Sequence, residues 1–76
     1  MLSFEITESG KTIQIHIDRE GLSILQRALD NLKKHGHIHL RSPPSGGSEL
    51  NDVTPWGNPA VQEVIITDGG EDPVSP

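Results

Sequence analysis

Three histidines are the residues whose types and spacing suit chemistry. His37 and His39 are two positions apart in an extended segment, so both side chains project from the same face of a strand. His16 lies on the outward face of an earlier predicted strand and adds a third imidazole if the two strands are neighbours. Three histidines with one open position form the ligand set of a catalytic zinc site. The alternative is that these rings only decorate a solvent-exposed sheet face, since a His-x-His pair alone indicates metal weakly.

The sequence lacks the motifs that mark a nucleophilic enzyme. The chain of 76 residues has no cysteine, and none of its serines lies in a Gly-x-Ser-x-Gly elbow. The Gly46-Gly47 pair is accompanied neither by the lysine of a phosphate-binding loop nor by a dinucleotide fingerprint. We therefore expect a protein that is not an enzyme and that uses no cofactor.

Charge and composition exclude two classes of partner. The chain has six basic and eleven acidic residues and a net charge of −5. Proteins usually bind nucleic acids through clusters of lysine and arginine. Because the basic residues of this chain are scattered, we expect no nucleic-acid partner. No window approaches the roughly 18 apolar residues of a membrane span, and the N-terminus lacks the features of a signal peptide. We expect a cytoplasmic protein that does not contact a membrane.

The elements that must position these residues follow from hydrophobic periodicity. Residues 2–8 and 12–18 alternate apolar and polar side chains, which predicts a β-hairpin with Ile13, Ile15 and Ile17 pointing inward. A helix is predicted from its N-cap Asp18 to a terminal Gly36. Its apolar stripe consists of leucines three and four positions apart, flanked by Ile24 and Ala28: Leu22, Leu25, Leu29 and Leu32.

Two further strands, residues 37–41 and 60–67, complete a ββαββ order. The predicted fold class is α+β, with one helix packed on a four-stranded, mostly antiparallel sheet. Residues 1–67 form a single domain and residues 68–76 a disordered tail. The third strand lies beside either the first or the second. The fourth strand is apolar on both faces, which allows a structural homodimer formed through it.

The long segment between the third and fourth strands is the candidate binding site. Residues 42–58 contain prolines and glycines and no strong periodicity, and so long a loop in a small domain usually has a function. It carries Trp56, the only tryptophan, a residue type enriched in binding hot spots. We predict a partner-binding surface made by five residues: Arg41, Ser45, Glu49, Asp52 and Trp56.

Several motifs resemble the immunity protein 32 family, small bacterial proteins assigned to polymorphic toxin systems. The resemblance covers residues 4–66, and its sharpest part is the His-x-His-Leu strand followed by Gly46-Gly47-Ser48-Glu49-Leu50. The helix start, Asp18-Arg19-Glu20-Gly21-Leu22, belongs to the same pattern. The family carries a tryptophan just before the Gly-Gly pair, where this chain has Ser45. The resemblance implies a non-catalytic protein that binds and neutralises a cognate protein toxin.

Overall fold

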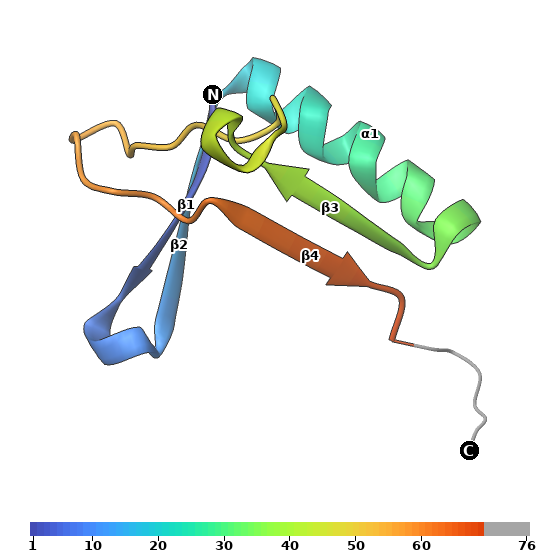
Figure 1. The fold of residues 1–76 in the computed structure, drawn as a ribbon, viewed down its shortest axis with the longest axis horizontal. Coiled ribbons are helices and arrows are strands. Elements are labelled where there is room, and N and C mark those ends of the chain that lie inside the picture. Colours follow the sequence, from blue (N-terminus) through green and yellow to red (C-terminus); the bar gives the residue numbers. More distant parts are fainter. Residues whose placement is uncertain (70–76) are drawn as a thin grey trace.

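The computed structural model describes residues 1–69 and shows an α+β fold with the predicted ββαββ order (Figure 1). The long helix lies along one side of a strand pair, and a second strand pair projects away from it. The elements are β1 (Leu2–Thr7), the 3-10 turn η1 (Glu8–Gly10), β2 (Thr12–Ile17), α1 (Arg19–His35), β3 (His37–Arg41), the 3-10 turn η2 (Pro43–Ser45) and β4 (Glu63–Thr67). Most of the tail predicted over 68–76 lies outside the described residues.

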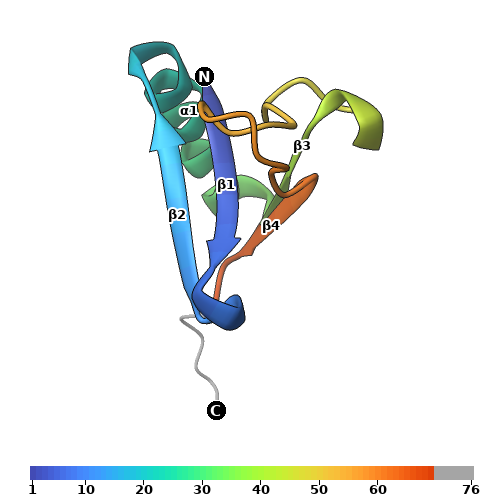
Figure 2. The same cartoon turned by 90° about the vertical axis from the view of Figure 1, so that its left-hand side faces the viewer.

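The predicted single sheet is wrong, because the four strands form two separate antiparallel pairs. β1 pairs with β2, and β3 pairs with β4. The third strand therefore lies beside neither the first nor the second. The loop prevents a continuous sheet: backbone N–H groups of Asn51 and Val61 donate to Leu2 O and Phe4 O, each at 2.8 Å, and so occupy the outer edge of β1. Figure 2 shows the two pairs diverging, with β1 between β2 and β4.

The helix boundaries are confirmed, and each end has a physical cause. Asp18 caps the N-terminus, where its side chain accepts a hydrogen bond from Gly21 N–H at 2.8 Å. Gly36 takes the left-handed conformation with φ 78° and donates its N–H to Leu32 O at 2.8 Å. A Cβ at Gly21 would come within 1.9 Å of Met1 O, so glycine is needed where the start of β1 crosses the helix.

The hydrophobic core is small and contains residues of β1, α1, β3, β4 and the loop before β4. Leu2, Phe4, Leu40 and Leu50 are buried together, and half-buried apolar residues surround them. These neighbours are Ile24, Leu25, Ala28, Val61, Val64 and Ile66. The predicted leucine stripe is only partly correct, since Leu22 and Leu29 are 46% and 42% exposed. The helix is rotated so that its predicted flank, Ile24 and Ala28, contacts the core.

The burial of the β2 side chains differs from the prediction, although the isoleucines do point to the side of the core residues of β1. Ile13, Ile15 and Ile17 are exposed, whereas His16 is buried at 8% exposure. The isoleucines share a face with Leu2 and Phe4, but one helix and a small core cover only the β1 side of that face. The opposite face, with His16, is contacted by the loop before β4. Loop contacts thus override the alternating pattern.

Candidate partner-binding surface

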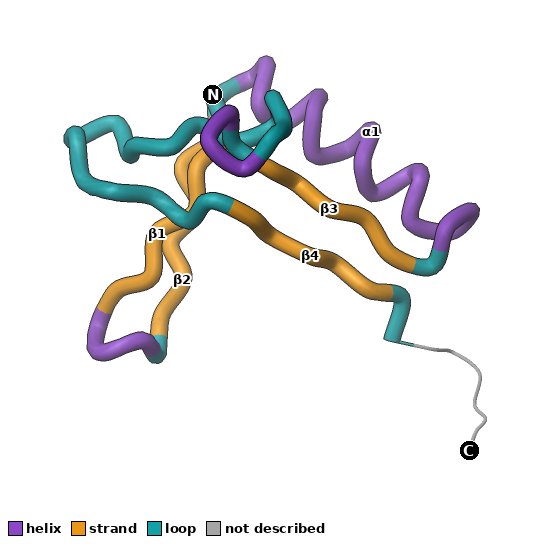
Figure 3. Tube along the Cα trace, in the orientation of Figure 1, coloured by secondary structure: helices purple, strands orange, loops and turns teal. Residues whose placement is uncertain are grey.

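The loop between η2 and β4 is ordered around a tight turn at Thr54. Thr54 is buried, and its Oγ1 accepts hydrogen bonds from the N–H groups of Trp56 at 3.3 Å and Asn58 at 3.1 Å. Thr54 N–H donates to Asn58 O at 2.8 Å, and Gly57 N–H donates to Thr54 O at 2.9 Å. Gly57 supplies the positive φ of 85° that the turn requires. Figure 3 shows this segment leaving the helix side, turning, and returning to the start of β4.

Trp56 stands on this turn and is the most exposed large apolar side chain of the described residues, at 70%. One side of its indole contacts the buried imidazole of His16, with ring centroids 4.8 Å apart and an interplanar angle of 66°. His16 is itself held by Glu5, whose Oε1 lies 3.1 Å from Nε2. The turn and this edge-on contact fix the indole while most of its surface stays free.

Glu49, a second predicted contact residue, is used to hold the loop together. Its Oε1 accepts a hydrogen bond from Arg41 N–H at 3.1 Å, and its own N–H donates to Arg41 O at 3.1 Å. The Arg41 N–H is the main reason that the pKa of Glu49 lies below its usual range. A Cβ on Gly47 would come within 2.6 Å of Arg41 Cβ, so this close approach requires glycine.

Four residues of the motifs that resemble the immunity family have structural roles. Gly21 and Gly47 have no Cβ, which allows the close approach of Met1 and Arg41 respectively. Glu49 attaches the loop to β3 by a hydrogen bond, and Leu50 is buried in the core at 3% exposure. None of these roles requires a partner. Trp56, which lies outside the Gly-Gly motif, is 70% exposed.

Arg41, Ser45 and Asp52 are exposed and make different contacts. The Arg41 side chain pairs with Glu63 on β4, with Nε 2.8 Å from Oε2, and His39 Nδ1 lies 2.8 Å from the same oxygen. Side-chain hydrogen bonds with His39 and then Arg41 hold the pKa of Glu63 below its usual range, His39 having the larger effect. Ser45 closes η2 through its N–H to Ser42 O at 2.9 Å, and Asp52 O accepts from Ala60 N–H at 3.1 Å. Of the five predicted contact residues, only Trp56 is a large exposed apolar side chain.

The three histidines do not form one site. His37 and His39 lie side by side on β3, with ring centroids 5.2 Å apart, as their spacing predicts. His16 belongs to the other strand pair, where its partners are Glu5 and Trp56. Within residues 1–69, no group of three or more histidine, aspartate or glutamate side chains is arranged to hold a metal ion. We do not propose the metal alternative for that reason.

Ser3, His16 and Glu5 share one face of the β1–β2 pair, a combination of residue types used in nucleophilic catalysis. Ser3 is fully buried, and its Oγ has no hydrogen-bond partner among the described residues. A hydroxyl that substrate cannot reach and that does not bond to the imidazole lacks the geometry of an activated nucleophile.

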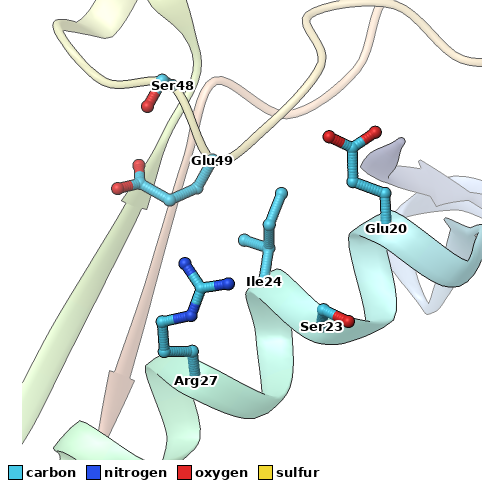
Figure 4. Close-up of a pocket in the computed structure, with 6 residues that line it drawn as sticks. All are labelled: Glu20, Ser23, Ile24, Arg27, Ser48 and Glu49. Atoms are coloured by element: carbon cyan, nitrogen blue, oxygen red, sulfur yellow. The ribbon is translucent and has the colours of Figure 1, made fainter.

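A groove of about 440 Å³ lies between the first half of α1 and the loop that follows η2 (Figure 4). Glu20 and Arg27 extend into it from the helix, and Ser48 and Glu49 face them from the loop. Its lining is mostly charged or hydroxylated, and Ile24 is its one apolar side chain. Small-molecule sites are usually enclosed and mainly apolar, so this groove is a weaker candidate than Trp56.

The exposure of the β2 isoleucines could not be found from sequence pattern, because residues that alternate with polar ones are expected in the core. Trp56 was predicted as a binding residue from its type and its place in the long loop. How far its indole is exposed depends on the side of the sheet to which the loop returns, and composition does not give that side. The close spacing of Thr54, Gly57 and Asn58 was the one available signal, since it suits a tight turn that presents its central residue.

Comparison with protein-family models, curated proteins and solved structures gives no match for the chain. No helix within residues 1–69 has the length and apolar character needed to cross a membrane.

Proposed function

We propose that this protein is a non-catalytic binding protein that neutralises a cognate bacterial toxin in the cytoplasm by direct contact. The observation that carries the proposal is Trp56, which is 70% exposed and yet fixed by the Thr54 turn and by His16. Tryptophan side chains dominate the binding energy of many protein interfaces. The toxin as partner rests on the resemblance of the chain to the immunity protein 32 family.

Rigidity of the exposed indole is the physical argument for binding rather than for chance exposure. A flexible aromatic side chain must lose its conformational freedom when a partner covers it, which weakens binding. Part of that freedom is already restricted in Trp56, because the backbone around it is hydrogen-bonded to Thr54 and its ring contacts His16. The energy gained by burying the indole is then available for affinity.

The charge of the chain supports a protein partner with a basic surface. The net charge is −5, and it would accelerate association with a cationic partner, such as a toxin that acts on nucleic acid. This effect is screened by salt. We therefore expect the association rate of the complex to fall as salt is raised, whereas the contribution of Trp56 persists because it is apolar.

The test uses the protein encoded by the gene next to that of this chain, in which the proposal expects a toxin domain. Cells that express this domain should grow when the intact chain is co-expressed and should stop growing without it. Trp56→Ala should reduce protection and weaken the purified complex, while Ile65→Ala, which truncates another exposed apolar side chain (54% exposed, on β4), should leave both unchanged. If the chain neither protects the cells nor binds the domain, the proposal is wrong.

A separate result would contradict the assignment of binding to the loop. A Trp56→Ala variant that is folded and binds as tightly as the intact chain would exclude Trp56 as the contact residue. Glu49→Lys is a poor test, because it removes the hydrogen bond that attaches the loop to Arg41 and disturbs the fold itself. Asp52→Lys is the better charge reversal, because Asp52 is exposed and only its backbone oxygen is used.

A further inference from the structure

The outer edge of β2 is open for the whole length of the strand. β2 pairs with β1 along one edge, and its other edge faces away from the rest of the fold (Figure 2). The edge of β1 is covered by the loop, but no described residue outside the pair bonds to the β2 backbone between residues 12 and 17. A free strand edge presents a row of unpaired N–H and C=O groups that another strand can use.

The register shows which residues of β2 present these groups. In an antiparallel pair, residues alternate between exchanging hydrogen bonds with the partner strand and pointing their N–H and C=O groups away from it. Leu2 and Phe4 direct their carbonyl groups to the loop, to Asn51 and Val61. Their partners in β2 are Ile17 and Ile15, and these must also point outward. Ile13, next in the alternation, points outward as well.

The side chains of the same three residues form an exposed apolar face. Ile13 is 64% exposed, Ile15 47% and Ile17 38%. Ile6 on β1, which pairs with Ile13, lies on the same face and is 58% exposed. We name these four residues the isoleucine face. β2 has no charged side chain and no proline, the two features that commonly block pairing at an edge.

We propose that β2 is the interface of a homodimer, in which β2 of a second copy pairs with it antiparallel to give one four-stranded sheet. A twofold axis at Ile15 places Ile15 opposite its own copy and Ile13 opposite Ile17 of the second copy. Every outward-pointing group then meets an outward-pointing group, as antiparallel pairing requires. The two isoleucine faces become one continuous apolar surface, and cross-strand pairs of β-branched side chains stabilise it.

The sequence around the strand favours a second copy as the occupant. The segment Thr12–Ile17 has isoleucine at every second position. An antiparallel second copy therefore places isoleucine opposite isoleucine, and a twofold interface requires such a self-complementary surface. The same axis places Thr12 opposite Asp18 of the second copy, and Asp18 is already bound to the N-terminus and to Gly21 N–H. Two chains of net charge −5 therefore meet along a strand that has no aspartate, glutamate, lysine or arginine.

This interface replaces the homodimer expected from the fourth strand. In β4, Val64 and Ile66 pack against the core, and of its apolar side chains only Ile65 is largely exposed, at 54%. Glu63 stands on the same face as Ile65 and is engaged with Arg41. The β2 interface is also separate from Trp56, which contacts the opposite face of the β1–β2 pair through His16.

The test is the oligomeric state of the full chain without any toxin. Analytical ultracentrifugation should show a mass that rises from one copy to two as the concentration increases. Ile15→Lys should remain monomeric at every concentration, because it places two like charges side by side at the twofold axis. Ile65→Lys is the matched control, with a similar exposed isoleucine on the other free edge, and should dimerise like the intact chain.

Amide hydrogen exchange identifies the strand independently of any substitution. The N–H groups of Ile13, Ile15 and Ile17 should become protected as the concentration is raised, and Gln14, already paired with Glu5 on β1, should change little. The proposal is overturned if the intact chain is monomeric throughout. It is equally overturned if Ile65→Lys dissociates the dimer and Ile15→Lys, shown to be folded by circular dichroism, does not. Neither result bears on Trp56 and toxin binding.

Discussion

Trp56 contacts His16 edge-on, with 4.8 Å between the ring centroids, so the most exposed large apolar side chain of the described residues rests on a buried histidine. The contact joins the tip of the loop to β2, and through Glu5 to β1. It helps to explain why the β1–β2 pair buries the polar side chain of His16. It also makes the position of the candidate binding residue dependent on a side chain that no partner needs to touch.

Replacing His16 should therefore affect both stability and the loop. His16→Ala removes the partner of Glu5 and the support of Trp56, and we expect the free energy of unfolding to fall by about 1–3 kcal/mol. Urea unfolding followed by circular dichroism measures this change. Gln14→Ala, on the same face of β2 but exposed, is the control and should shift stability by no more than about 0.5 kcal/mol. Equal effects of the two substitutions would show that His16 supports nothing.

Leu50 and Leu29 should respond very differently to truncation, although both are leucines in apolar patterns. Leu50 is 3% exposed and packs with Leu2, Phe4 and Leu40, so Leu50→Ala should destabilise the fold by about 2–5 kcal/mol. Leu29 is 42% exposed, and Leu29→Ala should cost far less. Thermal unfolding of the two variants is a direct measure. A large loss for Leu29→Ala would mean that the predicted leucine stripe, and not the flank with Ile24, faces the core.

Gly47 should not tolerate even a methyl group. The added Cβ would lie 2.6 Å from Arg41 Cβ and 2.8 Å from Arg41 O, so the loop must move away from β3. We expect Gly47→Ala to destabilise the protein by about 1–3 kcal/mol, the usual range for overpacking. Ser48→Ala, one position later and exposed, is the control. Comparable melting temperatures for both variants would contradict the close approach.

The hydrogen bond between Glu49 and Arg41 N–H should make stability depend on pH. The pKa of Glu49 is lowered in the folded state, so ionised Glu49 stabilises the fold above the pKa of the unfolded chain, about 4.3. This stabilisation is lost as the pH falls through the lower folded-state pKa. Glu49→Gln removes the titrating group. The stability difference between the intact chain and Glu49→Gln, measured by urea unfolding, should therefore shrink on acidification, and a constant difference would exclude this linkage.

The elements of the fold could be predicted because local rules decide them. Asp18 and Gly36 mark the ends of α1 by capping, and alternation gives the β1–β2 hairpin and β3. The pairing of β3 with β4 and the split into two sheets could not be predicted, since they depend on where Asn51 and Val61 bind the edge of β1. Alternation also cannot tell which face of a strand a loop will cover. For that reason His16 was predicted to be exposed and Ile15 to be buried, whereas the structure shows the opposite.

The candidate site was predictable only in part. The loop and Trp56 were identified from length and residue type, and the structure places Trp56 on the surface. Glu49 was assigned to a partner because a loop carboxylate is usually free, but it binds the backbone of β3. The shared face of His37 and His39 follows from strand geometry, whereas the distance of His16 from them follows from sheet topology, which spacing along the chain does not encode.

The indole N–H of Trp56 offers the most direct measurement of the central claim, because the chain has a single tryptophan and gives a single indole signal. The experiment records nuclear magnetic resonance spectra of the isotope-labelled chain while unlabelled toxin domain from the neighbouring gene is added. If Trp56 is the contact residue, this signal shifts or broadens in proportion to the complex formed and becomes protected from solvent. An indole signal that stays unchanged and solvent-accessible while other amide signals report binding would contradict the claim.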